Sequence, residues 1–432
     1  MDSLWSKTVF IKNFPQLKGN VKTDVLIIGG GIAGVLCAYF LEKENIPYIL
    51  VEAKNIGNGI TKNTTAKITA QHGLLYNKLL KNAGVEKAKQ YLSANMKAIN
   101  KFREICGGLC GFENKDAYIY TKNDKNAIEN EIAALDKLGC KTEFFHTIEL
   151  PFDIAGAVKM KNQAQFHPLL FLSHISENLN IYENTKITEL SPRKAKYEHG
   201  EITADKIIIA THFPFLNKHG GYFLKLYQHR SHIIALENAP VLNGIYLEDK
   251  KRLSFRSYEN IMIIGGGGHK TGKKSGNWQT LREFKIKAYP EAQEKYFWAA
   301  QDCMTLDGIP YIGKYNKKTE SLYVATGFNK WGMTSSMVSA MLLTDMIQGK
   351  KNEYEDVFSP QRSMMKKRLM VNGFTAAGNI ITPTKPRCPH MGCALKYNRA
   401  ERSWDCPCHG SRFEKTGELI NNPATDDIKI KK

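Results

Sequence analysis

The segment from residue 23 to residue 53, TDVLIIGGGIAGVLCAYFLEKENIPYILVEA, limits the fold of this chain more than any other. Residues 25–28 form a continuous apolar run that is typical of a buried parallel strand. Three glycines then follow at G-x-G-x-x-G spacing, which allows a tight turn, a close backbone approach to a pyrophosphate and close packing of the next helix. A second apolar run, residues 49–51, ends at Glu52, whose carboxylate can accept hydrogen bonds from ribose hydroxyls. The segment predicts a Rossmann-type dinucleotide site.

The dinucleotide is either NAD or FAD, and two later segments favour FAD. Residues 57–73, GNGITKNTTAKITAQHG, form a loop rich in Gly, Thr and Asn that contains Thr65, Lys67 and His72. Residues 307–350 give an apolar strand, a loop bounded by glycines and a helix that starts near Thr334. The positive end of such a helix would stabilise negative charge on the pyrimidine edge of a reduced flavin.

These segments resemble the D-amino-acid oxidase and glycine oxidase family of flavoenzymes over nearly all of residues 20–350. The resemblance implies an α/β Rossmann-type FAD-binding domain interleaved with an α+β substrate domain. We assign residues 20–75, 160–214 and 305–350 to the FAD-binding domain, and residues 76–159 and 215–304 to the substrate domain. Within the first insert, residues 76–105 and 124–138 are predicted helices, and Gly139 is a predicted C-cap.

The same resemblance implies which residues contact the cofactor. The strand TKITEL would present Ile187 to the adenine, and the strand ADKIIIATH would end at a cofactor-facing turn. The predicted FAD contacts are Gly29, Gly31, Gly34, Glu52, Thr65, Lys67, Ile187, Ala210, Thr211, Gly327, Gly332, Met333 and Thr334.

Residues 261–276, IMIIGGGGHKTGKKSG, also run from an apolar strand into glycines. No helix-forming sequence follows directly, because KTGKKSG has the composition of a loop. We therefore interpret the segment as a strand end that bends over a ligand, and not as a second Rossmann unit. A pyridine nucleotide then has no evident site of its own. Electrons are expected to reach the flavin directly from an organic substrate, with a transiently bound NAD(P)H as the alternative.

Composition and charge exclude several classes of protein. The 432 residues are 42% hydrophobic and 24% charged, as in a folded protein of two or three domains. No run approaches the roughly 18 uncharged apolar residues of a membrane span, and no signal peptide is evident, so we expect a cytoplasmic protein. The net charge is +19, but lysines are mixed with acidic residues along the whole chain, which argues against a nucleic-acid partner. An acidic electron carrier stays a candidate partner.

The nine cysteines are distributed unevenly. Five are scattered in the manner of a reduced intracellular protein, whereas four lie with two histidines in CPHMGCALKYNRAERSWDCPCHGSRF, residues 388–413. A Cys-x-His pair and a Cys-x-x-His pair suit a [2Fe-2S] centre held by two thiolates and two imidazoles. A structural zinc site is the alternative, because Cys2His2 is also a zinc ligand set.

The motifs C-P-H-M-G-C and C-P-C-H-G-S resemble the two cluster-binding loops of the Rieske family. The resemblance implies a small C-terminal β domain, residues 375–432, in which Cys388, His390, Cys406 and His409 are the ligands and Cys393 and Cys408 form a disulfide. Ser411 is expected to donate a hydrogen bond to a cluster sulfur, but Phe413 stands where high-potential members often have Tyr. The reduction potential should therefore lie in the lower half of the Rieske range. Few residues remain for the usual supporting sheet, so this abbreviated domain is expected to need the flavoprotein body.

Together these features predict an FAD-dependent dehydrogenase that takes a hydride from a small organic substrate and passes single electrons through the cluster to an external acceptor. By family likeness the substrate is an amine or amino-acid derivative. Two alternatives stay open: an electron-transfer or redox-sensing flavo-iron-sulfur protein with little turnover of its own, and a non-redox protein that binds zinc.

The substrate site is less well defined by the sequence. Amino-acid oxidising members carry an Arg before the D-G-x-P stretch, whereas this chain has Gln301 and Asp302, which argues against an α-amino acid. Cys303 lies near the position of the covalent flavin cysteine of sarcosine oxidases, although an ordinary buried Cys is the simpler interpretation. The catalytic candidates are Lys67, His72, His229, Arg230, His232, Arg256 and Lys330.

Overall fold

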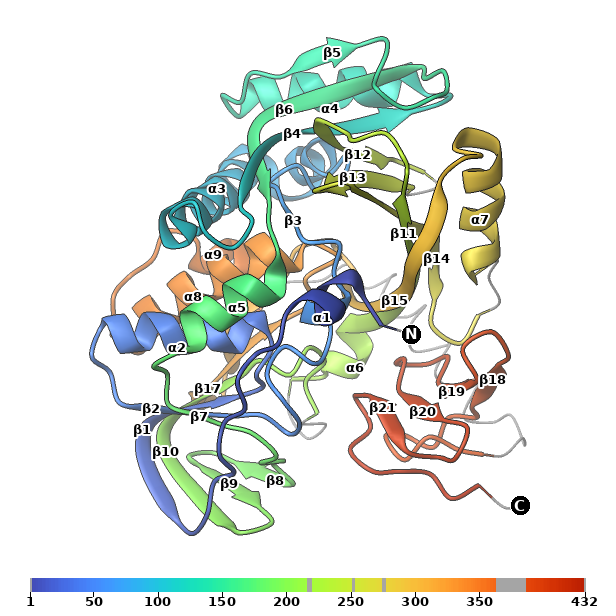
Figure 1. Ribbon diagram of the computed structural model, residues 1–432. Helices are drawn as coiled ribbons and strands as arrows, with labels where there is room; N and C mark the ends of the chain where they lie inside the picture. The colour runs from blue at the N-terminus through green and yellow to red at the C-terminus, as the bar shows by residue number, and fades with distance from the viewer. Residues whose placement is uncertain (1, 216–219, 251–252, 274–276, 363–385, 431–432) are drawn as a thin grey trace.

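The computed structural model describes residues 2–215, 220–250, 253–273, 277–362 and 386–430. Three β-sheets organise these residues (Figure 1). The first segment of the predicted third domain, residues 375–385, lies outside the described part of the chain. Within the described residues, no helix combines the length and the apolar character that a membrane crossing requires.

The first sheet contains the predicted dinucleotide-binding unit. Its main path has the order β16-β17-β10-β1-β2-β7, and β1, β2, β7, β10 and β17 run parallel along it. The strands are β1 (Val21–Ile28), β2 (Tyr48–Val51), β7 (Ile181–Tyr182), β10 (Gly200–Ile209), β16 (Tyr311–Asn316) and β17 (Thr319–Thr326), with β8 (Glu189–Ser191) and β9 (Lys194–Tyr197) off the main path. Helix α2 (Ile32–Lys43) follows β1 and packs against α8 (Gly332–Ile347). The sequence predicted both helices.

The second sheet is mostly antiparallel and has the order β15-β11-β14-β13-β12-β4-β6-β3. Its strands are β3 (Lys67–Ile68), β4 (Glu113–Thr121), β5 (Glu143–Phe145), β6 (Gly156–Gln165), β11 (Leu226–Glu237), β12 (Gly244–Glu248), β13 (Ser254–Tyr258), β14 (Ile261–Lys270) and β15 (Gln293–Thr305). β3 lies in a segment that we assign to the FAD-binding domain, and β6 crosses from one assigned domain into the other. Both strands belong to the second sheet, where they pair with each other, and β3 lies within the predicted cofactor loop, residues 57–73.

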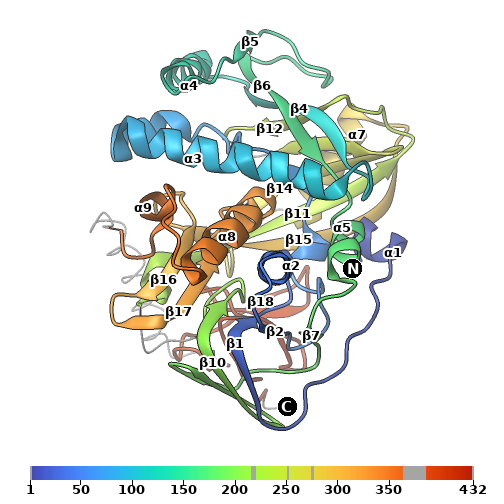
Figure 2. The same cartoon turned by 90° about the vertical axis from the view of Figure 1, so that its left-hand side faces the viewer.

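The helices of the first insert agree closely with the sequence prediction. Helix α3 (Tyr76–Cys106) passes over α8, as Figure 2 shows, and α4 (Lys125–Lys137) lies beyond it. The side chain of Asp124 caps α4 by accepting a hydrogen bond from the N–H of Ala127 at 3.2 Å. The C-cap of α4 is Leu138, one residue before the predicted Gly139, which follows it with φ +79 in the position where glycine commonly ends a helix.

The remaining helices are short or peripheral: α1 (Leu4–Thr8), η1 (Thr61–Asn63), α5 (Pro168–Ser176), α6 (Tyr222–Lys225), α7 (Asn277–Ala288) and α9 (Glu355–Phe358). The C-terminal sheet is antiparallel in the order β18 (Lys396–Asn398), β19 (Ser403–Asp405), β20 (Arg412–Glu414) and β21 (Leu419–Asn421). In Figure 1 this domain lies beside α6 and the ends of β11, β14 and β15.

Two strand predictions were wrong. The segment TKITEL is not a strand at Ile187, because the backbone of residues 184 and 185 turns aside to bond to Lys54 and Glu52, so β8 begins only at Glu189. The glycine run at 265–268 does not end its strand either. β14 continues through it to Lys270, paired antiparallel with β11, and no parallel Rossmann unit forms there.

Candidate functional site

A cavity of about 970 Å³ extends from the β1–α2 turn to the C-terminal domain. Its wall combines the ends of β1, β2 and β10, the face of β11 and β15, and residues 419–422, 424 and 425 of the C-terminal domain. Its volume lies at the upper end of the range for small-molecule and cofactor sites. Residues from all three sheets therefore contribute to one site.

The turn between β1 and α2 has the close packing that a dinucleotide cradle needs. A Cβ atom on Gly34 would lie 1.9 Å from the carbonyl oxygen of Gly29, so only glycine fits there. Gly31 is the N-cap of α2 and has no side chain to cap it. Glu52 accepts a hydrogen bond from the N–H of Gly30 at 2.7 Å, and burial raises the pKa of its carboxyl group. This donor and acceptor set fits a pyrophosphate and a ribose.

Most of the predicted cofactor contacts line this cavity. These are Gly29, Gly31, Glu52, Thr65, Lys67, Ile187, Ala210, Thr211, Gly332 and Met333. Gly34, Gly327 and Thr334 are not part of its wall. A Cβ atom on Gly327 would lie 2.4 Å from Cγ2 of Thr305, and Thr334 donates to the carbonyl oxygen of Thr69 at 3.3 Å, so both support the loops around the cavity.

Lys67 lies in the cavity wall among other cations. Burial lowers the pKa of its ammonium group to about 7, and the charges of Arg256 and Lys330 lower it further. Arg256 is fully buried and donates from Nη1 to the carbonyl oxygens of Thr65 and Ala66 at 2.8 and 2.7 Å. Burial likewise lowers the pKa of Arg256 to about 9. Arg256 thus orients the loop that carries Lys67, without lining the cavity itself.

The pair Lys330 and Asp302 forms another charged part of the wall. Lys330 Nζ lies 3.0 Å from Asp302 Oδ2 and 2.5 Å from the hydroxyl oxygen of Ser231. His229 also lines the cavity and is the β11 partner of Asp302 in β15. This group places a carboxylate, an ammonium and an imidazole on one side of the cavity.

His72 is buried among hydrogen-bonding and stacking partners. Its Nδ1 lies 2.7 Å from the hydroxyl of Tyr91, its Nε2 lies 2.7 Å from the carbonyl oxygen of Thr69, and its ring stacks on Trp331 at 4.6 Å. Burial lowers the pKa of His72 to about 3. His72 borders a second cavity of about 440 Å³, which also has Trp331 in its wall.

Arg230 and His232 belong to an ion cluster shared with the C-terminal domain. Arg230 Nε donates to Glu401 at 2.9 Å, Arg412 Nη2 donates to Glu401 Oε2 at 2.9 Å, and His232 Nε2 lies 3.4 Å from Oε1. Burial opposes the charge of Glu401, but the two guanidinium groups overcome it and hold its pKa well below the usual range. We therefore infer that Arg230 and His232 position a domain interface, although Arg230 also reaches the cavity wall.

Cys303 lies behind the cavity wall. It is 2% exposed, its Sγ lies 3.6 Å from the hydroxyl oxygen of Thr326, and burial raises its pKa to about 12. Neighbouring Asp302 lines the cavity, whereas Cys303 does not. Adjacent side chains of a strand point to opposite faces, which explains the difference. The structure supports the interpretation of Cys303 as an ordinary buried cysteine.

The two C-terminal loops bring the four predicted ligands together. The imidazole rings of His390 and His409 lie 4.9 Å apart, and the thiols of Cys388 and Cys406 contact each other. His409 Nδ1 is buried and has no hydrogen-bond partner. The pKa of Cys406 is lowered to about 7, first by the Cys388 contact and then by N–H groups of residues 408–410. Two buried thiols and an unpartnered buried imidazole nitrogen fit a [2Fe-2S] cluster.

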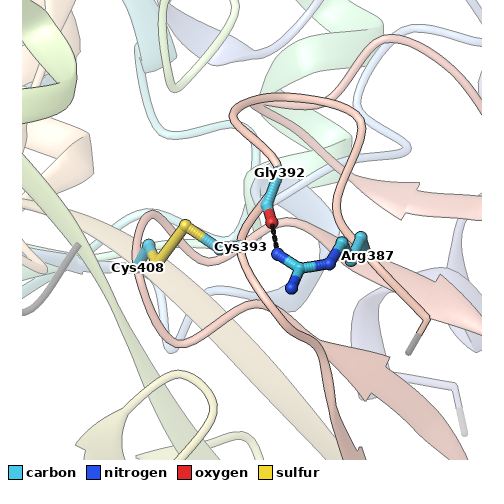
Figure 3. Close-up of a disulfide and its surroundings, with 4 residues drawn as sticks. All are labelled: Arg387, Gly392, Cys393 and Cys408. Atoms are coloured by element: carbon cyan, nitrogen blue, oxygen red, sulfur yellow. Dashed lines mark hydrogen bonds between the residues drawn. A yellow bond between two sulfur atoms is a disulfide. The ribbon is translucent and has the colours of Figure 1, made fainter. Parts of the chain in front are cut away.

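A disulfide joins the two loops between Cys393 and Cys408, and Figure 3 shows it beside Arg387. Arg387 Nη1 donates to the carbonyl oxygen of Gly392 at 2.7 Å and so supports the first loop. The sulfurs of Cys393, Cys406 and Cys408 also lie close enough to share a metal ion. Because the disulfide leaves Cys393 and Cys408 without thiolates, we do not interpret that trio as a site.

Ser411 and Phe413 lie beside the ligand loops. The hydroxyl of Ser411 contacts the Cys388 sulfur, and the hydroxyl oxygen accepts from the N–H of Ala424 at 3.0 Å. Phe413 is fully buried in the apolar core of the domain and has no polar group to offer. Ser411 therefore lies where it can donate the predicted hydrogen bond to a sulfur. Phe413 offers no second donor, as the sequence predicted.

Sequence reasoning missed the residues that join the domains. Glu401, Arg412, Gln228, Gln301 and Asn422 make buried or partly buried polar contacts across the interface. Glu401 and Arg412 are charged residues of a short domain, and such residues are usually exposed. Their burial depends on a partner far away in sequence, so no local pattern could have revealed it.

Comparison with known proteins decides the family. The family model "FAD dependent oxidoreductase" (DAO) matches residues 24–346, about three quarters of the chain. The chain belongs to the FAD-dependent oxidoreductase family. A second model, the Rieske [2Fe-2S] domain, matches residues 349–432. This DAO-family enzyme is therefore an FAD-dependent oxidoreductase that has FAD and a [2Fe-2S] cluster as its cofactors.

Relatives share either the whole architecture or one part of it. YhfW of Bacillus subtilis (strain 168), which carries the name of a Rieske 2Fe-2S iron-sulfur protein, is 32% identical over 99% of this chain and 97% of its own. Gamma-glutamylputrescine oxidoreductase of Escherichia coli (strain K12) is 21% identical over 84% of this chain and 93% of its own. The cytochrome b6-f complex iron-sulfur subunit 1 of Nostoc sp. (strain PCC 7120) is 40% identical over 10% of this chain and 24% of its own.

Solved structures confirm the fold of the flavoprotein part. Glycine oxidase from Geobacillus kaustophilus matches with a TM-score of 0.66 and 18% identity, covering 80% of this chain and all of that one. L-proline dehydrogenase from P. horikoshii also has a TM-score of 0.66, with 16% identity, and covers 81% of this chain and 98% of its own. The predicted α/β fold with a small C-terminal β domain is confirmed.

Proposed function

We propose that this enzyme is a dehydrogenase that oxidises a small amine or amino-acid derivative and passes the electrons one at a time to an external acceptor. FAD accepts a hydride and can release its electrons singly, and a [2Fe-2S] cluster takes one electron at a time. The chain would hold the cluster through Cys388, His390, Cys406 and His409, and FAD through the predicted contacts around the β1–α2 turn.

One observation carries this proposal: a single cavity has both the nucleotide cradle and the C-terminal domain in its wall. The second cluster loop lies against β11 and β15, whose other face borders that cavity, because Gln301 donates to the carbonyl oxygen of Gly410 at 2.9 Å. A cluster docked there would lie close to the flavin, as electron transfer within one chain requires.

The charges around the cavity favour an amine over an α-amino acid. In the segment where amino-acid oxidising relatives would carry a carboxylate-binding Arg, Asp302 presents a negative group to the cavity and Gln301 points to the C-terminal domain. Asp302 can accept a hydrogen bond from a substrate ammonium or amine. The name of the Escherichia coli relative, which refers to gamma-glutamylputrescine, is consistent with an amine.

Lys67 would hold a proton near the reacting part of the cavity. Its pKa of about 7 lets it exist in both protonation states near neutral pH, as an acid–base group needs. Lys330 would orient Asp302 through their ion pair, and Trp331 would limit access of water from the second cavity. We place this chemistry in the cytoplasm, with an acidic electron carrier as the acceptor suited to a chain of net charge +19.

Anaerobic mixing of the purified holoenzyme with a panel of amines, N-alkyl amino acids and α-amino acids tests the proposal. We expect amines to bleach the flavin absorbance and then reduce the cluster, seen by electron paramagnetic resonance. Flavin bleaching only by reduced carrier proteins would favour an electron-transfer or redox-sensing protein instead. Absence of iron from the purified protein would contradict both.

A further inference from the structure

Two buried glutamines of the substrate sheet contact the C-terminal domain, a buried threonine supports one of them, and none of the three has a part in the proposed chemistry. Gln228 in β11, Gln301 in β15 and Thr271 after β14 are at most 1% exposed. Buried polar groups in a protein interior need partners, and a fully paired network specifies one arrangement.

The amide nitrogens of both glutamines donate to the C-terminal domain, and their amide oxygens accept within the flavoprotein part. Gln301 Nε2 donates to Gln228 Oε1 at 2.5 Å and to the carbonyl oxygen of Gly410 at 2.9 Å, while Thr271 donates to Gln301 Oε1 at 3.1 Å. Gln228 Nε2 donates to the carbonyl oxygen of Asn422 at 2.7 Å. The amides thus bind the backbone of two C-terminal loops, one of which directly follows His409.

Steric fit supports the same contact. Gly410 has φ +87, and a Cβ atom at this position would lie 2.5 Å from Cβ of Gln228. The cluster loop can therefore approach β11 closely only because residue 410 is glycine. Gly410 also donates its N–H to the carbonyl oxygen of Cys406 at 3.0 Å, which links this close approach to the shape of the ligand loop.

We propose that Gln301 and Gln228 are positioning residues for electron transfer: they fix the second cluster-binding loop against the strands whose opposite face borders the flavin cavity. The inference rests on the proposed flow of electrons from flavin to cluster. In each transfer one electron leaves reduced FAD and converts one ferric iron to ferrous iron, and no bond of the protein forms or breaks. The two glutamines therefore act on distance and order, not on the chemistry itself.

The test uses full-length holoenzyme carrying Gln301→Leu, which keeps the approximate side-chain size and removes the donors. Under anaerobic conditions a flash-generated deazaflavin reductant reduces the FAD, and the visible absorbance of the cluster reports its reduction. We expect the rate constant for electron transfer from FAD to the cluster to fall on the order of tenfold or more, because small misplacements of reacting groups have effects of this size. The reduction potentials of FAD and of the cluster should stay at their wild-type values. An unchanged rate constant overturns the proposal.

Gln165→Leu is the matched control. Gln165 is also a buried amide of the substrate sheet, and it donates to the carbonyl oxygen of Ser257 at 2.6 Å without contacting the C-terminal domain. This variant should transfer electrons at the wild-type rate. If Gln301→Leu does not fold, Gln301→Glu keeps the side-chain length and the acceptor for Thr271 but loses both donors, and the same slowing is expected.

Hydrogen–deuterium exchange separates failure of this inference from failure of the proposed function. Peptides that cover residues 406–412 should exchange faster in Gln301→Leu than in wild type or in Gln165→Leu. If wild-type flavin does not reduce the cluster at all, the proposed function fails, but faster exchange would still show that Gln301 fixes the loop. Unchanged exchange overturns the positioning role whatever the electron-transfer result.

Discussion

At the scale of single residues, position 413 offers a way to vary the environment of the cluster. Phe413 is buried beside the ligand loops, where it offers no donor to a cluster sulfur. In Phe413→Tyr we expect the cluster potential to rise by on the order of 40 mV, since one added hydrogen bond contributes about 1 kcal/mol and 59 mV corresponds to a factor of ten for one electron. Redox titration followed by electron paramagnetic resonance measures the change. A potential equal to or below that of wild type would contradict this account.

His72 gives a prediction about acid stability. Its pKa is lowered from 6.5 to about 3 because it is buried, so the unfolded chain binds a proton between these pH values that the folded protein does not. The contribution of neutral His72 to stability is therefore complete above pH 6.5 and is lost as the pH falls toward 3.

We expect His72→Gln to make the unfolding free energy less dependent on pH, by up to about 1.4 kcal/mol per pH unit in this window. Urea unfolding between pH 7 and pH 4 measures the dependence. His199→Gln, at a side chain that is 41% exposed, is the control. Its unfolding free energy should depend on pH nearly as that of the wild type does. Equal pH dependence in His72→Gln and wild type would show that His72 is not kept neutral.

At the scale of elements, the β1–α2 turn depends on close packing at one glycine. In Gly34→Ala the new methyl group would meet the carbonyl oxygen of Gly29 at 1.9 Å, so α2 has to move away from β1. We expect the purified variant to lose most of its FAD while Cys37→Ala, in the same buried helix, keeps it. Flavin absorbance per mole of protein measures the difference. A Gly34→Ala protein that is fully loaded with FAD would contradict the assignment of this turn.

The sequence predicts an element well when the residues that determine it lie within that element. The β1–α2–β2 unit, α3, α4 and the two cluster loops were predicted because glycine spacing, capping residues and cysteine spacing act within one element. The strand at Ile187 was predicted wrongly, since the backbone of residues 184 and 185 bonds to Lys54 and Glu52, far away in the sequence. The prediction of a strand end at the glycines of β14 was wrong, because the tolerance of glycines inside a strand depends on β11 and on the cavity beside them.

At the scale of the whole molecule, the C-terminal domain is joined to the flavoprotein by the buried cluster around Glu401. Removing the negative charge leaves Arg230 and Arg412 without their shared partner, and breaking a buried ion pair in this way costs about 3–5 kcal/mol. We therefore expect Glu401→Gln to destabilise the docked domain, with faster proteolysis after residue 386 and a lower temperature for loss of the cluster absorbance. Glu414→Gln, at an exposed position of the same domain, is the control. Equal behaviour of the two variants would contradict a role for this ion cluster in docking.

The same dependence predicts the behaviour of the isolated domain. The segment 375–432 expressed alone lacks Arg230, Gln228 and Gln301, so Glu401 and the backbone of its second ligand loop lose buried partners. We expect this fragment not to retain its cluster, as judged by its iron content and colour. A stable reddish fragment would show that the domain folds without the flavoprotein.

The wall contributed by residues 419–422, 424 and 425 also has a consequence for cofactor exchange. These residues close the cavity on the side of the C-terminal domain, next to the contact between Lys186 and Thr425. We therefore expect bound FAD to dissociate faster when that domain lifts from the body, so that residues 386–430 act as a cap on the flavin as well as a carrier of iron. The off-rate of FAD should consequently rise when the cap is loosened, even though no residue of the nucleotide cradle has changed.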